Sequence, residues 1–265
     1  MKTKISSVVE GPTAKAYAIK ITTNFQDETI TEIYTKSKRV FIPLEKILGK
    51  RFLEADSLGK NILLFFNGDT AIRIHLMMFG AIHIYEINEP LQKPKERVRL
   101  MATGEKKKLV VYNAPIIEVD YRDKILQRLK GELGPDPLSG ECDKAKAIRN
   151  IMNHPDQKIG VALLNQSVIA GIGNILRNEI LFRAKVHPDR TIASLSLQEI
   201  EKIVDYTEQI SREFLNRKLQ GKGIKDLLSV YNRFSGFCMV CGHPIKFYMQ
   251  KPINRKTFVC ENCQK

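Results

Sequence analysis

The sequence has no run of eighteen apolar residues and no apolar stretch after its charged first residues. The first absence excludes a membrane-spanning helix, and the second argues against a secretory signal. It also contains no internal repeat and no low-complexity segment. We therefore expect a cytoplasmic protein. Its 265 residues, 43% of them hydrophobic, suffice for one large or two moderate domains, each with its own core.

Acidic residues are scarce beside basic ones. The chain has 29 Asp and Glu against 43 Lys and Arg, which gives a formal net charge of +14. The basic runs lie at residues 36–39, 93–97, 106–108 and 217–225. This balance favours a polyanionic partner, most of all nucleic acid. The alternatives are a solvated basic surface and an anionic membrane, although no basic amphipathic helix stands out for the latter.

Cysteines are few, and four of the five form two CxxC pairs separated by eighteen residues. In a reducing compartment such pairs bind metal rather than form disulfides. Four thiolates complete a tetrahedral zinc site and leave no open position, so we expect one structural zinc ion. A pair of redox disulfides is the alternative. The predicted ligands are Cys238, Cys241, Cys260 and Cys263, and Cys142 is interpreted as an isolated thiol.

The hydrophobic pattern changes along the chain. The first 120 residues favour strands, among them 62–66, 71–76, 81–85 and 109–112, with Asn67-Gly68 as a tight-turn signal. Residues 12–21 form the exception, a short helix opening at Pro12. Beyond the breaker cluster at 134–137 the pattern becomes helical to about Ser229, with a capping box at Ser196 and Glu199. Aromatic residues around 247–248 and 257–258 predict a hairpin between the two CxxC pairs.

A glycine-rich turn at residues 171–174 precedes an apolar helix. Free N–H groups at a helix start favour phosphate, glycine permits a close approach, and the Asn174 side chain adds a donor. Taken alone, the turn is better interpreted as a corner packed for shape.

Five segments of the chain resemble motifs of the formamidopyrimidine-DNA glycosylase and endonuclease VIII family. Residues 163–182 resemble its helix–two-turn–helix element, and residues 231–264 resemble its zinc finger. The stretch 133–138 matches its interdomain segment, Val9-Glu10-Gly11-Pro12 its N-terminal signature, and Gly59-Lys60 its lysine loop. The five matches follow the family's order and span nearly the whole chain.

The resemblance implies an α+β multidomain protein. Residues 9–125 would form an N-terminal β-sandwich catalytic domain with a flanking helix, and residues 126–138 the interdomain linker. Residues 139–232 would form the helix–two-turn–helix DNA-binding domain, and residues 233–265 a zinc-finger β-hairpin. It further implies a monomeric, nucleoid-associated repair enzyme that acts on damaged DNA, duplex or single-stranded.

The resemblance also implies chemistry, in which a flipped nucleotide is attacked at C1′ by the α-amine of the mature first residue. An α-amine has a pKa of about 7.7–8.0, so a useful fraction is neutral at physiological pH. By position Val9 is the nucleophile and Glu10 the general acid/base. Lys60 would contact phosphates or protonate the leaving group, and Arg255 would hold phosphates at the hairpin tip. Without the resemblance, Lys60 and Arg255 are surface charges.

Three further positions follow from the resemblance. Asn174 would bind backbone phosphate, and Glu179 matches an acidic position near the active site, although it could simply cap or pair on its helix. Met78 and Phe79 lie in the loop that fills the gap left by the flipped base, as an apolar wedge can, or else belong to the core. Residues 113–117 lack the Arg and Phe of the formamidopyrimidine branch, so the sequence is closer to endonuclease VIII.

The start of the chain departs from the family. Eight residues precede Val9, so its nitrogen is an amide here, valine replaces the usual proline, and Thr13 stands where many members have a second glutamate. We hypothesise that Val8 marks the native start, because an initiator Met at that position would be removed and leave Val9 free. Two alternatives remain, a catalytically silent protein that binds damaged DNA and an RNA-binding zinc protein.

Overall fold

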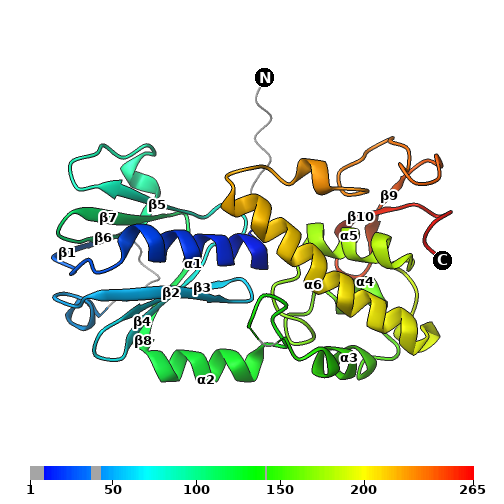
Figure 1. Cartoon of the computed structure of the whole chain (residues 1–265), viewed down its shortest axis with the longest axis horizontal. Coiled ribbons are helices and arrows are strands. Elements are labelled where there is room, and N and C mark those ends of the chain that lie inside the picture. Colours follow the sequence, from blue (N-terminus) through cyan, green and yellow to red (C-terminus); the bar gives the residue numbers. More distant parts are fainter. Residues whose placement is uncertain (1–8, 37–42, 141) are drawn as a thin grey trace. The chain divides into compact units, whose positions relative to one another are not determined.

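The computed structural model describes residues 9–36, 43–140 and 142–265, so the hypothesis on Val8 lies outside the described residues. The chain divides into two compact units (Figure 1). The N-terminal unit contains Val9 and residues 13–131, and the C-terminal unit contains Glu10–Pro12 and Glu132–Lys265. Among the described helices, none combines the length and the apolar character that crossing a bilayer requires.

The N-terminal unit is a sandwich of two antiparallel four-stranded sheets (Figure 1). The first has the order β2 (Phe52–Leu58), β3 (Asn61–Phe66), β4 (Thr70–His75), β8 (Ile116–Tyr121). The second has the order β1 (Glu32–Thr35), β6 (Val98–Thr103), β7 (Lys107–Tyr112), β5 (Ala81–Glu86). Two 3₁₀ turns lie at Leu44–Lys46 and Lys95–Arg97. The predicted sandwich is confirmed.

Alternation along the strands builds the core of the sandwich. In β4, Ile72 and Ile74 are buried in the core whereas Arg73 and His75 are only half-buried, as a period of two requires. The apolar run of β3 is buried throughout. Its outward ring, Phe65, lies beneath the Arg122 guanidinium at 4.1 Å.

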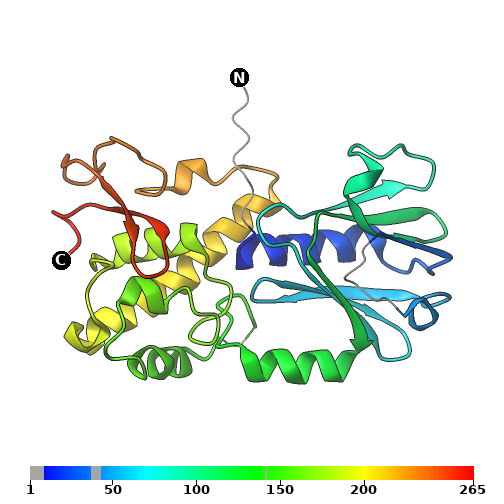
Figure 2. The same cartoon turned by 180° about the vertical axis from the view of Figure 1, so that it is seen from behind.

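Two helices belong to this part of the chain. Helix α1 (Gly11–Phe25) is longer than the predicted 12–21, and its Ala14, Ile21 and Phe25 join the sandwich core. In both views α1 runs alongside the two sheets, which is the predicted flanking helix (Figures 1 and 2). Helix α2 (Arg122–Glu132) begins directly after β8 and buries Ile125 and Leu129.

The C-terminal unit is helical up to its hairpin. Its helices are α3 (Lys144–Met152), α4 (Ile159–Ala162), α5 (Asn174–Ala184) and α6 (Leu197–Leu219), with 3₁₀ turns at Ile192–Ser194 and Lys225–Leu227. One apolar cluster joins the four helices, with Ile151, Ile159, Leu176 and Ile203 at its centre. The predicted helical region is therefore confirmed.

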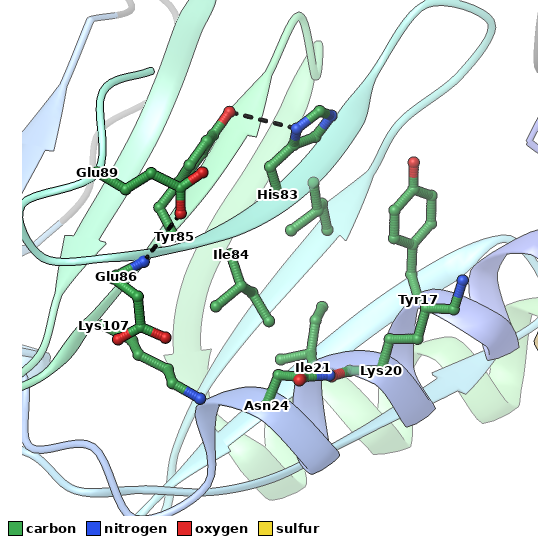
Figure 3. Close-up of a pocket in the computed structure, with 11 residues that line it drawn as sticks. Tyr17, Lys20, Ile21, Asn24, His83, Ile84, Tyr85, Glu86, Glu89 and Lys107 are labelled. Atoms are coloured by element: carbon green, nitrogen blue, oxygen red, sulfur yellow. Dashed lines mark hydrogen bonds between the residues drawn. The ribbon is translucent and has the colours of Figure 1, made fainter. Parts of the chain in front are cut away.

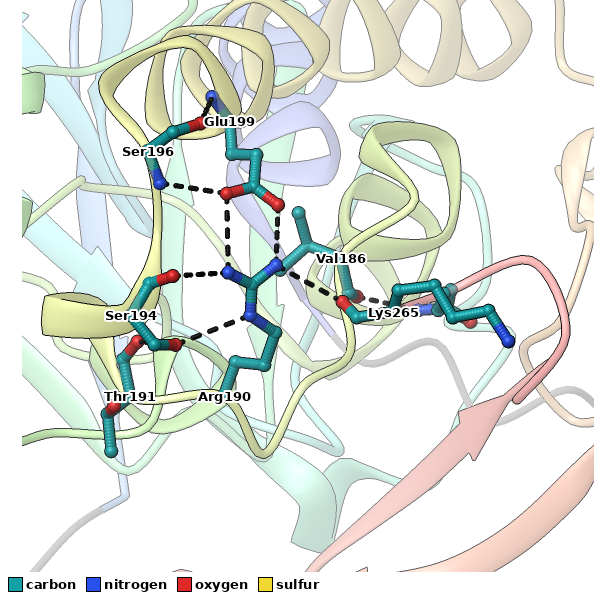
Figure 4. A network of polar contacts seen from close by, with 8 residues as sticks. Val186, Arg190, Thr191, Ser194, Ser196, Glu199 and Lys265 are labelled. Atoms are coloured by element: carbon teal, nitrogen blue, oxygen red, sulfur yellow. Dashed lines mark hydrogen bonds and ion pairs between the residues drawn. The ribbon is translucent and has the colours of Figure 1, made fainter.

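The start of α6 is tied to the end of the chain. The predicted capping box is present, since Ser196 Oγ accepts the Glu199 N–H and Glu199 Oε2 accepts the Ser196 N–H. Arg190 pairs with the same Glu199 carboxylate at 2.5 Å and donates to the Lys265 carbonyl at 3.3 Å (Figure 4). One arginine therefore fixes both the α6 N-terminus and the last residue.

The chain closes with the antiparallel hairpin of β9 (Lys246–Gln250) and β10 (Arg255–Val259). Its register pairs Tyr248 with Thr257 and Phe247 with Phe258, the four residues from which a hairpin was predicted. Strand β10 lies against α5, where Asn178 Oδ1 accepts the Phe258 N–H at 2.8 Å (Figure 2).

Candidate functional site

Val9 lies at one end of the sandwich. It is buried, and its backbone N–H donates to the Met77 carbonyl at 3.3 Å. Met77 belongs to the loop of residues 76–80, which connects β4 to β5. Within the N-terminal unit, the predicted nucleophile and the predicted gap-filling loop are therefore neighbours.

Lys60 and His75 lie in the same region. Lys60 follows Gly59 in the turn between β2 and β3, and Gly59 takes a φ of +58° that favours glycine. Burial, then the positive charges of Arg73 and Lys60, lower the pKa of His75 to about 4. The neutral imidazole accepts the Met77 N–H through Nδ1 at 3.3 Å. Sequence reasoning missed this ring, although the alternation of β4 places His75 on the outward face beside Arg73.

The loop of residues 76–80 carries exposed apolar side chains. Phe79 is 69% exposed, and Met77 and Met78 are about half exposed, so the interpretation of Met78 and Phe79 as core residues is wrong. The loop is held at its base, because the Gly80 N–H donates to the Leu76 carbonyl and Asn113 Nδ2 to the Phe79 carbonyl. A fixed loop with apolar tips has the character of a wedge.

Glu10 enters the C-terminal unit and meets the start of α5. Its carboxylate is buried and accepts the Ile175 N–H at 2.7 Å and the Leu176 N–H at 3.1 Å. A Cβ on Gly173 would lie 2.4 Å from this carboxylate, so a larger residue there would displace the Glu10 side chain from the helix start. An anion does lie at this helix start, as the glycine-rich turn suggested, but it is the protein's own glutamate.

Two other predicted residues lie on α5. Asn174 opens the helix, and its Nδ2 donates to the Lys256 carbonyl at 2.9 Å. Glu179 is 0% exposed and accepts the backbone N–H groups of Ser229, Val230 and Tyr231 at 2.7–3.0 Å. Burial raises the pKa of Glu179, and the three N–H donors oppose that rise. Glu179 thus holds the segment that leads into the hairpin.

Arg177 is a buried cation that sequence reasoning missed. It is 0% exposed, and its guanidinium donates to Gln250 Oε1, Thr257 Oγ1 and the carbonyls of Gly160 and Lys256. Burial lowers the pKa of Arg177 to about 10, which leaves it protonated at neutral pH. The available signal was its spacing from Asn174 and Asn178, which places all three on one helical face.

Arg255 is exposed at the start of β10, beside the tip of the hairpin. The residues before it, 251–254, form the turn, and Asn254 takes a φ of +48°. Arg177 and Asn174 hold the carbonyl of the next residue, Lys256, from the opposite side. The guanidinium of Arg255 is thus presented to solvent from a base that α5 anchors.

The four CxxC cysteines gather at one point of the segment 233–265, which we call the cysteine module. Their sulfur atoms all lie within 4.8 Å of one another. Cys238 Sγ lies 3.9 Å from Cys263 Sγ, and Cys241 Sγ 3.4 Å from Cys260 Sγ. Zn–S bonds of about 2.3 Å in a tetrahedron require S···S edges of about 3.8 Å. The donor set therefore fits a metal ion bound by four thiolates.

A separate cleft of about 480 Å³ opens on the sandwich, between α1 and β5 (Figure 3). Tyr17 and Lys20 line it from the helix, and His83, Glu86 and Lys107 from the strands. The residues that line it include none of the predicted site residues. The candidate site described above is therefore separate from this cleft.

Two family models match the chain. The model described as the formamidopyrimidine-DNA glycosylase N-terminal domain matches residues 8–115. The model described as the H2TH domain of the same family matches residues 133–226. The two models lie in the order that the sequence motifs predicted.

Proteins of similar sequence match most of the chain. The formamidopyrimidine-DNA glycosylase of Syntrophomonas wolfei is 31% identical over 233 residues, which cover 83% of this chain and 85% of the relative. A protein of Streptomyces coelicolor named probable endonuclease 8 2 is 27% identical over 82% of this chain and 80% of its own length. Both branch names occur, so the assignment to the endonuclease VIII branch stays a prediction.

Solved structures share the fold. The Lactococcus lactis Fpg in a complex with DNA that contains an abasic site has a TM-score of 0.87 and 22% identity, with 97% of this chain and 99% of that chain covered. The same protein in a complex with FAPY-dG containing DNA has a TM-score of 0.86 at 22% identity, with 96% and 99% covered. At this identity the likeness shows the fold alone.

Proposed function

The chain belongs to the formamidopyrimidine-DNA glycosylase family, and on that premise we propose that it is a DNA glycosylase and abasic-site lyase of base-excision repair. Its substrates are oxidised bases, which it reaches by flipping the nucleotide out of the duplex. The observation that supports this most is the match of both family domains in order over residues 8–115 and 133–226. The non-catalytic alternative is not favoured, because the relatives carry enzyme names.

The proposed nucleophile is the α-amine of Val9 in a chain whose mature form begins there. Its nitrogen bonds to C1′ while the bond between C1′ and the base breaks, and the base leaves with a proton. The C1′–O4′ bond of the sugar ring then breaks, O4′ takes a proton, and the nitrogen, which keeps one hydrogen, forms a protonated Schiff base at C1′. Removal of a C2′ proton then breaks the C3′–O bond and cuts the strand. Glu10, the next residue, moves these protons as general acid/base.

Other residues hold the DNA. Lys60 contacts phosphate or protonates the leaving group, while Met78 and Phe79 fill the gap in the stack. Arg255 and Asn174 hold the phosphates flanking the lesion, and Glu179 acts through the segment 229–231 that it positions. The protein works as a monomer in the cytoplasm, on nucleoid DNA.

The metal is one structural zinc ion held by the four thiolates of the cysteine module. Bound zinc supplies no reaction step, because four sulfur ligands leave no position for substrate. The role of Cys238, Cys241, Cys260 and Cys263 is to fix the hairpin that carries Arg255.

Borohydride reduction on an abasic-site duplex tests this function. We expect a covalent adduct with a chain that begins at Val9 and none with the chain that begins at Met1, because only the first has an amine at Val9. A Val9 chain with an acetylated N-terminus is the matched control and should give no adduct.

The opposite result has a clear meaning. Equal adduct from the Met1 chain, lost in Lys60→Arg, would identify Lys60 as the amine and overturn the Val9 assignment. Absence of adduct from every form, despite tight binding to abasic DNA, would overturn the lyase function.

A further inference from the structure

Apolar side chains are exposed on the cysteine module. Phe237 is 65% exposed and Met239 77%, and these are among the most exposed large apolar residues in the described chain. The other exposed large apolar residues of the module are Phe234, Val240, Phe247 and Met249, and we call the six together the aromatic face. Large exposed apolar patches mark interaction sites in soluble proteins.

Two rings of this face, Phe234 and Phe247, rest on one buried ring, Phe258. The Phe234 centroid lies 4.8 Å from Phe247, and both lie about 5 Å from Phe258, which is 1% exposed. Strand alternation turns Phe247 and Met249 to the same side of β9. The other side, with Tyr248 and Gln250, bonds to Asp189. Phe247 and Met249 thus lie on the outward side of a hairpin whose other side is anchored to Asp189.

The surroundings of this face are basic. The cysteine module has six Lys and Arg against one acidic residue, Glu261, which pairs with Lys246 at 2.7 Å. Across the described residues, Arg233, Lys251, Arg255 and Lys256 have no ion-pair partner. Lys256 Nζ lies 5.5 Å from the Phe234 ring centre, so a cation and a ring are presented together.

We propose that the aromatic face binds single-stranded DNA, with unpaired bases stacked on Phe234, Phe237 and Phe247. The phosphates of the strand pair with Arg233, Lys251 and Lys256. An apolar protein partner would leave these cations unused, and a polyanion without bases would leave the rings unused. A duplex hides the base faces in its own stack, whereas a single strand offers both groups. The proposal rests on the proposed function only in taking DNA as the ligand.

Fluorescence anisotropy of the zinc-loaded full chain with a labelled twelve-residue thymidine strand tests it. The triple variant Phe234→Leu, Phe237→Leu, Phe247→Leu removes the rings. The leucines at positions 234 and 247 keep apolar contact with Phe258. We expect its affinity for the strand to fall about tenfold or more. The matching triple Phe→Tyr variant should bind within about twofold of wild type.

Three controls separate stacking from charge and from damage to the fold. Tyr121→Leu removes an exposed ring that also has a lysine, Lys46, over it at 4.7 Å, but lies in the sandwich, and it should not change binding. Inorganic polyphosphate, which has charge but no bases, should bind equally well to wild type and to the Leu variant. If the triple Leu variant lacks its full zinc content, the single variant Phe237→Leu replaces it, because that ring is the most exposed of the three.

Unchanged affinity of the zinc-loaded Leu variant for the thymidine strand would overturn the proposal. Tighter binding of the matching RNA strand than of the thymidine strand would also overturn it. So would a wild-type protein that is a dimer and a Leu variant that is a monomer, because the rings would then form a contact between two copies of the chain. Borohydride trapping on the abasic duplex should be the same in a chain that begins at Val9 and in that chain with either triple substitution. Failure of trapping in the unsubstituted chain that begins at Val9 would count against the proposed function and would leave this proposal standing.

Discussion

At the scale of single residues, His75 shows how a local charge state can fix a loop. Its neutral ring accepts the Met77 N–H, which only an unprotonated nitrogen can do. Its pKa of about 4 lies below the value of about 6.5 of an unfolded chain. The folded state therefore resists a proton that the unfolded state accepts. The stability from this ring is fully present above pH 6.5 and is lost as the pH falls towards 4.

Replacing His75 by asparagine tests this reasoning. The asparagine side chain cannot titrate but can still accept the Met77 N–H through its oxygen. Between pH 7 and pH 5 we expect wild type to lose about 1 kcal/mol more unfolding free energy than His75→Asn, since water screens part of the effect at a half-buried ring. Urea unfolding at the two pH values measures the difference. Equal losses in the two proteins would contradict the low pKa.

Sequence patterns identified the candidate residues but did not predict what those residues contact. The carboxylate of Glu10 meets the start of α5, more than 160 positions later, and no periodicity in the sequence predicts such a contact. The two CxxC pairs were the opposite case, because tetrahedral chemistry alone requires four sulfurs to meet. Local chemistry can be predicted from spacing, whereas contacts across the chain need the fold.

At the scale of elements, α5 joins the helical core to the hairpin. Asn174, Arg177 and Asn178 share the face that meets β10, and Glu179 holds the segment before the hairpin. Helical spacing predicts the shared face but not that a strand eighty residues later covers it. Since Arg177 has no direct carboxylate contact among the described residues, its hydrogen bonds to the hairpin balance the cost of burying its charge.

We expect Arg177→Met to loosen the hairpin. The change leaves Gln250 Oε1, Thr257 Oγ1 and the Gly160 carbonyl without the Arg177 donor, at a cost of about 1–3 kcal/mol for each group left unsatisfied. The Lys256 carbonyl keeps its donor Asn174. A loss of about 3 kcal/mol or more in unfolding free energy should accompany faster zinc release to a chelator.

Arg212→Met is the matched control, because Arg212 is exposed on α6 and pairs with Glu208 of the same helix. That variant should stay within about 0.5 kcal/mol of wild type. Zinc release at the wild-type rate from Arg177→Met would show that the hairpin does not depend on this cation.

At the scale of the whole molecule, the chain contains separate hydrophobic cores. One lies inside the sandwich, one among the helices, and a small one, with Val230, Phe258 and Cys260, beneath the cysteine module. The order of these parts could be predicted from the change in hydrophobic period along the sequence. The small core is rich in cysteine, and such a core depends on its metal, because zinc binding to such modules contributes roughly 10–16 kcal/mol.

Removal of zinc should therefore unfold the cysteine module at the C-terminal end and leave the sandwich folded. After chelation we expect the backbone amides of β9 and β10 to lose their protection from hydrogen exchange, while those of β3 and β4 keep theirs. DNA binding should fall in parallel, because Arg255 and the aromatic face lose their support. Cys260→Ser should behave like the chelated protein, whereas Cys142→Ser should bind one zinc ion and keep full protection, since Cys142 lies outside the cluster. Loss of protection in β3 and β4 together with β9 and β10 would show that the cores unfold as one, and the sandwich that carries Val9 would then depend on the metal as well.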